Sequence, residues 1–556
     1  MQKETQQCKK CHQNFQINQD DFSFYEKIKV PVSKICPDCR FQLLSLWRNE
    51  MTLYSGIKCD LCKKYILSMY HHKSSYKVYC YDCYMSDSWD ARQYAKEYNF
   101  DKIFFDQLNE LFHKVPCKNT SIDSSAGINI NSEYANYAGA MKDCYMVFNG
   151  GIGEEIMYCR GVRKSKEVVD SYFSEHLEKC YECINTLKSN GLIFSRNTTD
   201  SIDSIFTLNC SGLNNCFGCV NLRNKSNCWF NEQLSYGEYK KRLNEVMGSY
   251  SKINEARKKF EDFSLSFPRK ENNNFRNVDS YGDYLTECKN VNNSFEVIGA
   301  ENCSNLFSSR DLRNSDGSIG FGNKSELFLN CIGSGFSSNI ICSCSISNSR
   351  NILYSIYLIN CHDCIGCDGL KNAEYCVLNK QYTKEEYEKI KEYIVKELTE
   401  KDIYGLMMPP EISPFAYNET IAQDNMPLTK EEAIAQGFRW EDDIQMTKGK
   451  ETLQQEEIPD HINDIKDEIV KEILRCIDCK RNYKITEQEL LFYRKMKLPI
   501  PRKCFFCRHQ DRIKRRGSYK FWDRKCDHCG KDIKTNYSPD RKEIIYCEKC
   551  YKQEVV

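Results

Sequence analysis

Between residues 131 and 380 the chain alternates short β-prone runs with polar or Asn-rich turns at a spacing of 12 residues. In one series the runs begin near residues 142, 154, 166, 178 and 190. A second series places equivalent positions at Asn290, Asn302, Asn314, Glu326, Ser338, Arg350, His362 and Glu374. A 12-residue unit is too short for a helical repeat. Two such units predict one coil of about 24 residues in a parallel β-helix, whose stacked coils bury a continuous core.

The repeat region is itself duplicated. Residues 216–243 align with residues 364–391, and three cysteines of each copy keep a constant offset. After its last β runs, each copy continues into an amphipathic segment, which predicts helices over residues 236–262 and 383–399. An exposed β edge invites aggregation, so we expect these helices to cap the open ends of the solenoid.

Residues 400–472 have a different composition, rich in acidic residues, proline and glutamine. A capping box formed by Thr429 and Glu432 predicts a helix that ends near Gly437. The stretch from Lys448 to Glu468 has the composition of a flexible acidic tether.

Both ends of the chain carry pairs of C-x-x-C motifs. Two such motifs supply four thiolates, which complete a tetrahedral zinc site and leave no position for a catalytic water. Regularly spaced cysteines of a reduced compartment indicate metal ligands before disulfides, and redox C-x-x-C chemistry is the less favoured alternative. We therefore predict four structural zinc ions. Their ligands are Cys8, Cys11, Cys36 and Cys39; Cys59, Cys62, Cys80 and Cys83; Cys476, Cys479, Cys504 and Cys507; and Cys526, Cys529, Cys547 and Cys550.

The loops between the cysteine pairs show that the two ends are copies. The first and third sites have loops of equal length, 12–35 and 480–503, and the second and fourth share a shorter length, 63–79 and 530–546. The motif from Cys476 to Arg508 resembles the zinc-ribbon (treble-clef-like) family, with Thr486, Phe492 and Pro499 at matching positions. The copy at Cys8–Arg40 matches less closely, because Asn18 replaces the threonine. This resemblance covers about 35 residues at each end and implies metal binding, not a reaction.

The whole layout also resembles cysteine-rich proteins of giant DNA viruses and of candidate-phyla bacteria. That resemblance includes residues 413–440 and implies no particular activity.

Eighteen further cysteines lie outside the four sites, almost all of them in the repeat region. One interpretation makes them additional metal ligands, best at Cys210, Cys216, Cys219 and Cys228 and at Cys361, Cys364, Cys367 and Cys376. The favoured interpretation makes them small side chains that point into the core, because free cysteine is among the most buried residue types.

The two terminal copies differ in charge. Residues 473–520 contain 15 basic and 4 acidic residues, against 7 and 5 in residues 5–52. The excess follows the last cysteine pair, where a helix would bring arginines onto one face. Such a cluster suits contacts with the phosphates of RNA or DNA, although it can also dock on the acidic tether or stay solvated. The candidate contacts are Arg502, Lys503, Arg508, Arg512, Lys514, Arg515, Arg516 and Lys520. In the amino-terminal copy the same helix carries Leu43, Leu44, Leu46 and Trp47, which predicts packing against the solenoid.

The remaining features of the sequence limit the possible functions. The net charge of +1 supports no global electrostatic argument. We expect an intracellular protein, in the cytoplasm or in a virion or virus factory, because neither a signal peptide nor an apolar membrane span is evident. The usual nucleotide-binding, metalloprotease and hydrolase motifs do not occur, so we predict that the protein is not an enzyme. A weak third hypothesis is a glycan-acting β-helix enzyme that uses Asp170, Glu175 and Asp203.

The predicted fold is mainly β, with a duplicated parallel β-helix-like solenoid flanked by paired treble-clef zinc modules and capped by helices. The first functional hypothesis is a zinc protein that binds nucleic acid, and the second is a structural or interaction scaffold, such as a virion component, with protein partners on the solenoid. The predicted segments are module 1 (1–50), module 2 with a helical connector (51–116), solenoid half 1 (117–235), a capping helix and linker (236–273), solenoid half 2 (274–382), a capping helix (383–404), an acidic linker (405–471), module 3 (472–520) and module 4 (521–556).

Overall fold

The computed structural model describes residues 4–123 and 126–555 and divides into two units. Unit 1 combines Met1–Ser121 with Asn274–Ile444, and unit 2 combines Ile122–Asn273 with Gln445–Val556. Modules 1 and 2 thus belong with the second repeat region, and modules 3 and 4 belong with the first. The duplicated ends of the chain have a simple structural consequence: each repeat region has its own pair of cysteine modules.

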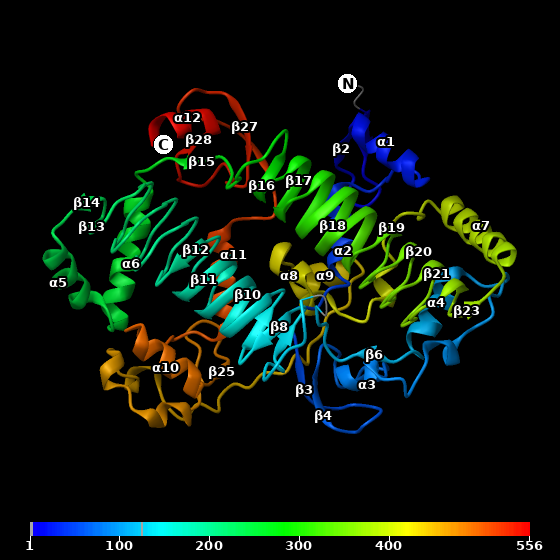
Figure 1. The fold of residues 1–556 in the computed structure, drawn as a ribbon, viewed down its shortest axis with the longest axis horizontal. Helices are drawn as coiled ribbons and strands as arrows, with labels where there is room; N and C mark the ends of the chain where they lie inside the picture. Colours follow the sequence, from blue (N-terminus) through cyan, green and yellow to red (C-terminus); the bar gives the residue numbers. More distant parts are fainter. Residues whose placement is uncertain (1–3, 124–125, 556) are drawn as a thin grey trace. The chain divides into compact units, whose positions relative to one another are not determined.

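The repeat region of unit 2, here called the first ladder (residues 122–229), is built from parallel pairings in which partners lie one repeat apart. Ile193 pairs with Ile205, which pairs with Phe217. Figure 1 shows the chain winding repeatedly through the same path in β10 to β12. Its strands are β7 (Ala135–Asn136), β8 (Gly139–Lys142), β9 (Tyr145–Phe148), β10 (Gly151–Val169), β11 (Tyr172–Tyr181), β12 (Leu187–Asn190) and β13 (Cys228–Trp229).

One coil takes a single repeat, as the pairing of Arg160 with Tyr172 shows, so the predicted coil of two repeats is wrong. Nearly every third residue of the ladder has a positive φ, as in the series Asp170, Phe173, His176 and Lys179. A left-handed residue after every two extended residues bends the chain, and four such positions fall within each 12-residue repeat. Asn tolerates this conformation better than most residues. The side chain of Asn197 hydrogen-bonds to those of Asn185 and Asn209, one period away on either side, at 2.9 and 3.0 Å.

Every third side chain also points into the core of the ladder. Serine and threonine serve there beside leucine, because their hydroxyl groups bond to the backbone. Ser189 Oγ, for example, donates to the carbonyl of Leu187 at 2.8 Å and accepts from the N–H of Ser201 at 3.2 Å. All eight cysteines of the first ladder lie at this three-residue spacing and are buried. This placement favours the packing interpretation of the central cysteines.

Unit 1 contains the second ladder (residues 275–377), which has the same parallel pairing between successive repeats. Its hydrogen bond from Phe328 N–H to Ser315 Oγ spans 13 residues, so one extra residue shifts the inward positions by one. Its strands are β16 (Tyr281–Thr286), β17 (Lys289–Ile298), β18 (Glu301–Gly335), β19 (Ser338–Ile341), β20 (Arg350–Leu353), β21 (His362–Ile365) and β22 (Glu374–Val377).

Each ladder ends in an antiparallel turn followed by helix, close to the prediction. In unit 2, β13 pairs with β14 (Glu232–Gln233), and α5 (Tyr236–Val246) and α6 (Tyr250–Ser264) follow as two helices in place of the one predicted. In unit 1, β22 pairs with β23 (Lys380–Gln381), and α7 (Lys384–Glu400) follows. The equivalent residues Tyr239 and Tyr387 are both fully buried and lie beside aromatic rings of the last coil.

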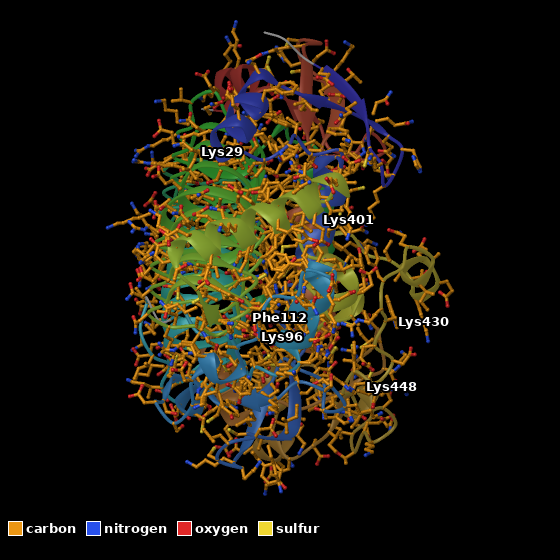
Figure 2. The ribbon with its side chains drawn as sticks, turned by 90° about the vertical axis from the view of Figure 1, so that its right-hand side faces the viewer. Lys29, Lys96, Phe112, Lys401, Lys430 and Lys448 are labelled. Carbon is orange, nitrogen blue, oxygen red and sulfur yellow. The ribbon has the colours of Figure 1, made fainter. Side chains whose placement is uncertain are left out.

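Modules 1 and 2 form the rest of the amino-terminal part of unit 1. In Figure 2, Lys29 marks the left-handed end of α1, with φ of 57°, and Phe112 lies among the side chains that pack around α4. Their elements are β1 (Glu4–Gln7), β2 (Asn14–Ile17), α1 (Gln19–Ile28), α2 (Pro37–Ser45), β3 (Tyr54–Lys58), β4 (Tyr65–Ser68), β5 (Val78–Tyr79), α3 (Tyr81–Met85), the 3₁₀ helix η1 (Ala91–Tyr94), α4 (Phe104–Phe112) and β6 (Cys117–Lys118).

Modules 3 and 4 repeat this plan in unit 2, and Lys497, with φ of 50°, is the equivalent of Lys29. Strand β28 of module 4 pairs in parallel with β15 (Arg269–Lys270), a short strand in the linker that follows α6. The other elements are β24 (Leu474–Arg475), β25 (Asn482–Tyr483), α10 (Glu487–Lys495), α11 (Phe505–Arg516), β26 (Trp522–Lys525), β27 (Asp532–Thr535), β28 (Ile545–Tyr546) and α12 (Glu548–Val555).

The acidic linker is divided between the two units and is anchored in both by buried apolar side chains, among them Tyr417 and Ile462. The predicted capping box of Thr429 and Glu432 is confirmed at the start of α9. No described helix is long and apolar enough to span a membrane. The elements of the linker are η2 (Pro410–Ile412), η3 (Tyr417–Glu419), α8 (Ile421–Asn425), α9 (Lys430–Ala435), η4 (Gln455–Glu457), η5 (Ile462–Asp464) and η6 (Asp467–Val470).

Candidate metal centres and the docking of their modules

The sixteen predicted ligands form four groups of four cysteines, grouped as the sequence predicts. Within each group the sulfur atoms all lie within 4.8 Å of one another. The four groups can therefore each hold one metal ion.

The same local turn presents the first pair of thiols in every module. The backbone N–H of His12 donates to the carbonyl of Cys8 at 2.9 Å, and that of Lys480 donates to Cys476 at 3.2 Å. Both residues are left-handed, as are Lys63 and Gly530 at the matching positions of modules 2 and 4. Backbone N–H groups also point at the sulfurs: that of Cys36 donates to Cys8 Sγ at 3.3 Å.

The spacing of the sulfur atoms fits a tetrahedral metal. A metal–sulfur bond of about 2.3 Å places tetrahedral sulfurs about 3.8 Å apart. The observed Sγ–Sγ distances are 3.7 Å for Cys11 and Cys36 and 3.6 Å for Cys479 and Cys504. They are 3.8 Å for Cys62 and Cys80 and 3.9 Å for Cys529 and Cys547. Four thiolates of this geometry suit zinc or iron and leave no open coordination position.

In each of the four groups, hydrogen bonds favour the thiolate form of one cysteine; in module 2, burial acts against them, yet backbone hydrogen bonds lower the pKa of Cys59 to about 7. The side chain of Cys504, followed by backbone N–H groups, lowers the pKa of Cys476 to about 4. The side chain of Cys39 similarly lowers the pKa of Cys36 to about 5. Burial acts in the opposite direction on Cys526, yet its backbone hydrogen bonds lower its pKa to about 6. Because metals bind the deprotonated sulfur, each site is prepared for a cation.

A fifth group, which the sequence did not predict, brings His71 and His72 close to Asp443 in unit 1. His71 Nε2 lies 3.8 Å from an Asp443 oxygen, and Lys73 Nζ already pairs with the same carboxylate at 2.7 Å. The backbone N–H of Lys73 donates to His71 Nδ1, so the neutral imidazole carries its proton on Nε2. This arrangement suits an ion-pair cluster better than a metal site.

The arginines after the last cysteine pair of module 3 are buried against the first ladder. Arg512 is 1% exposed, and its Nη1 lies 2.7 Å from Asp170 Oδ1. Arg508 Nε lies 2.8 Å from the other oxygen of Asp170, which is itself fully buried. The guanidinium of Arg508 also lies over the ring of Tyr158. One ladder carboxylate thus receives two arginines from α11.

A second acidic residue of the ladder, Glu182, pairs with an arginine in the next turn of α11. Glu182 accepts hydrogen bonds from Arg257 of α6 at 2.8 and 2.9 Å, and Arg515 pairs with the same carboxylate. Burial alone would raise the pKa of Glu182, but Arg257 and Arg515 hold it well below its ordinary value. Arg516 Nη1 donates to the hydroxyl of Tyr172 at 3.0 Å.

In module 1, one buried arginine pairs with a carboxylate of the second ladder. Arg40 follows the last cysteine of its site as Arg508 does, and forms two contacts with Asp316, of 2.7 and 3.2 Å. The hydroxyl of Tyr25 donates to the same carboxylate at 2.8 Å. Apolar side chains also contribute, with Leu44 2% exposed and Phe41 edge-on to Phe307 of the ladder. The fully buried Arg48, which pairs with Glu50, has its guanidinium over the ring of Phe321. The predicted packing face of this helix is therefore present.

The eight basic residues predicted to contact nucleic acid do not form one exposed face. Five arginines, Arg502, Arg508, Arg512, Arg515 and Arg516, contact protein groups and are buried or nearly so. The predicted dock on the acidic tether is met only by Arg502, which donates to the carbonyls of Ile458 and Pro459. Lys503 pairs with Asp478 and Asp511. Lys514 and Lys520 remain exposed.

The acidic side of the interface was missed by the sequence analysis, which considered Asp170 only as a catalytic candidate. Asp170 is sealed beneath α11, Glu175 pairs with Lys164 at 3.0 Å, and Asp203 is an exposed corner residue. Sequence alone offered one signal, the surplus of arginine in α11, because buried arginines require counter-charges elsewhere in the chain.

A comparison with models of known protein families found no match, and a comparison with curated protein sequences also found none. The similarity of modules 1 and 3 to zinc ribbons therefore rests on the cysteine motifs and their geometry.

Proposed function

We propose that the protein is a non-enzymatic, zinc-stabilised interaction scaffold. In this proposal the two ladders are β-solenoid halves, and each is clamped by a pair of treble-clef modules. The main support for the proposal is that Arg508 and Arg512 are buried against Asp170. The positive charge that suggested nucleic-acid binding is therefore largely used in contacts within the protein. Four thiolates per site support zinc in a purely structural role, since no coordination position is left for a reacting water.

The second ladder offers a surface on which a partner can bind. An open groove of about 1100 Å³ follows its corners, and it combines charged, polar and aromatic side chains. Phe336 is 41% exposed there, although large apolar side chains are usually covered. Arg313 and Arg350 line the same groove. An aromatic anchor together with arginines is typical of the residues that dominate protein interfaces.

A photo-crosslinking residue placed at position 336 of the full chain tests this function in extracts of the native source. The proposal expects a discrete protein adduct that survives nuclease treatment. Position 188 of the first ladder, a lysine at the corresponding place in the repeat, is the matched control. Adducts that disappear with nuclease, or equal yields from both positions, would argue against the scaffold.

Nucleic-acid binding remains the second candidate, on a smaller surface. Lys514 and Lys520 are exposed, and Lys520 lies over the ring of Trp522. Two lysines predict weak binding to RNA or DNA with a shallow salt dependence. Filter binding with the full chain at two salt concentrations separates this candidate from the scaffold.

A further inference from the structure

A cavity of about 190 Å³ lies inside unit 2, between the first ladder, α6 and module 3. Aromatic and aliphatic side chains make up much of its wall, including Tyr181, Phe194 and Leu498, which are at most 6% exposed. This volume is well above what a single water needs, so the cavity has room for several waters or for one small ion.

The charged side chains around this cavity are unbalanced. Four are basic and two are acidic. Most of them are compensated: Glu182 holds Arg257, Lys503 pairs with Asp511 and Asp478, and Arg508 pairs with Asp170. The remaining cation is Arg502.

Arg502 is 7% exposed and makes no ion pair with any residue that the structure describes. Its Nη2 donates to the carbonyls of Ile458 and Pro459, and its guanidinium lies over the ring of Tyr250 at 5.0 Å. A desolvated charge without a partner is costly, so the site favours a counter-ion.

Unused hydrogen-bond donors point to the same conclusion. Among the described residues, Arg502 Nη1, Arg257 Nε and Arg508 Nη2 are buried and have no hydrogen-bond acceptor; the carboxylate oxygen Oε1 of Glu489 lies 3.9 Å from Arg508 Nη2. All three arginines line the cavity. Buried polar atoms are nearly always hydrogen-bonded, and guanidinium groups match the oxygens of phosphate or sulfate.

We propose that this cavity binds a small tetrahedral oxyanion, of the phosphate or sulfate class, with Arg502 as the principal counter-charge and Arg257 and Arg508 as additional donors. The donors converge on a small part of the cavity wall, so we assign a free anion and not the phosphate of a nucleic acid. The anion would join α6, the first ladder and module 3, and so stabilise unit 2. This inference does not depend on the scaffold function.

Calorimetric titration of the full, metal-loaded chain with phosphate, against chloride at equal ionic strength, tests the proposal. We expect saturable binding at one site and a rise in the unfolding temperature of unit 2. Sulfate should compete with phosphate, whereas adenosine monophosphate should not, and competition by the nucleotide would contradict the free-anion assignment.

Arg502→Gln should weaken phosphate binding at least about tenfold, or 1.4 kcal/mol. Lys34 is the equivalent residue of module 1, is 44% exposed and pairs with Asp402, so Lys34→Gln is the matched control and should change nothing. Metal content and circular dichroism check that each variant folds. Absence of saturable binding by the unaltered chain at roughly millimolar phosphate would overturn the proposal without recourse to any variant. Equal binding by Arg502→Gln would overturn the role of Arg502.

Discussion

The helices that follow the last cysteine pair of modules 1 and 3 occupy equivalent places but dock by different chemistry. Eight residues after the first cysteine of that pair, α2 carries Leu44, 2% exposed, and α11 carries Arg512, 1% exposed. Three positions later the residues are Trp47 and Arg515. The arginine adjacent to the last ligand is common to both, as Arg40 and Arg508.

This difference explains the charge asymmetry of the two ends. Module 3 is more basic than module 1 because its helix docks by ion pairs, for which the first ladder supplies Asp170 and Glu182. In module 1 the ladder supplies Asp316 for Arg40, the buried Arg48 is paired with Glu50 of its own module, and Leu44 and Phe41 add apolar contacts. A basic cluster in a sequence can thus be the inner face of an interface within the same chain.

The largest effect should come from the loss of a metal ligand, which should destabilise modules 1 and 3 alike. Cys504→Ser in module 3 and Cys36→Ser in module 1 should each remove one of four metal ions, because a structural zinc site contributes on the order of 10 kcal/mol. Metal analysis and hydrogen exchange of the docked helix measure the result. Full metal content or undiminished protection of α11 in Cys504→Ser would contradict the structural role.

Loss of the ladder carboxylate should be more severe in unit 2 than in unit 1. Asp170→Asn leaves two buried arginines without a counter-charge, and breaking such a contact costs roughly 3–5 kcal/mol. Asp316→Asn leaves only Arg40 uncompensated and should cost less. Urea unfolding followed by hydrogen exchange, which reports each unit separately, gives both values. Equal losses would refute the difference in docking chemistry.

Truncation of the apolar contact should mainly affect unit 1. Leu44→Ala removes a fully buried side chain and should cost about 2–5 kcal/mol, depending on how far the interface collapses. The same urea and hydrogen-exchange experiment measures it, with the exposed Leu491, 65% exposed, as a control that should change little when replaced by alanine. A loss below about 1 kcal/mol would indicate that α2 does not pack as described.

The smallest effect should come from the exposed lysines of module 3. Lys514→Ala with Lys520→Ala should alter stability by less than about 0.5 kcal/mol. Two phosphate contacts predict a slope of log affinity against log salt no steeper than about −2 for the unaltered chain. Binding with a slope of about −4 or steeper would restore the nucleic-acid hypothesis.

The sequence was sufficient for the features that depend on local spacing. The C-x-x-C pairs correctly grouped all sixteen candidate ligands into four clusters, and the repeat read from the sequence is present in the parallel pairing. The coil length was misjudged because the left-handed corners fall on residues as different as Phe173, His176 and Lys179, which carry no turn signal. Docking could not be predicted, since Asp170 and Arg512 are 342 residues apart and only the folded chain brings them together.

The central claim, that the basic helix of module 3 is an internal docking element, is tested most directly by a double-mutant cycle between Asp170 and Arg512. The variants are Asp170→Asn, Arg512→Leu, which copies Leu44 of module 1, and their combination, all in the full chain. If the two side chains form the buried pair described here, the double variant should lose less unfolding free energy than the two single variants lose together. We expect this difference to be about 2 kcal/mol or more. Losses that add within about 0.5 kcal/mol would show that the residues do not interact and would contradict the account.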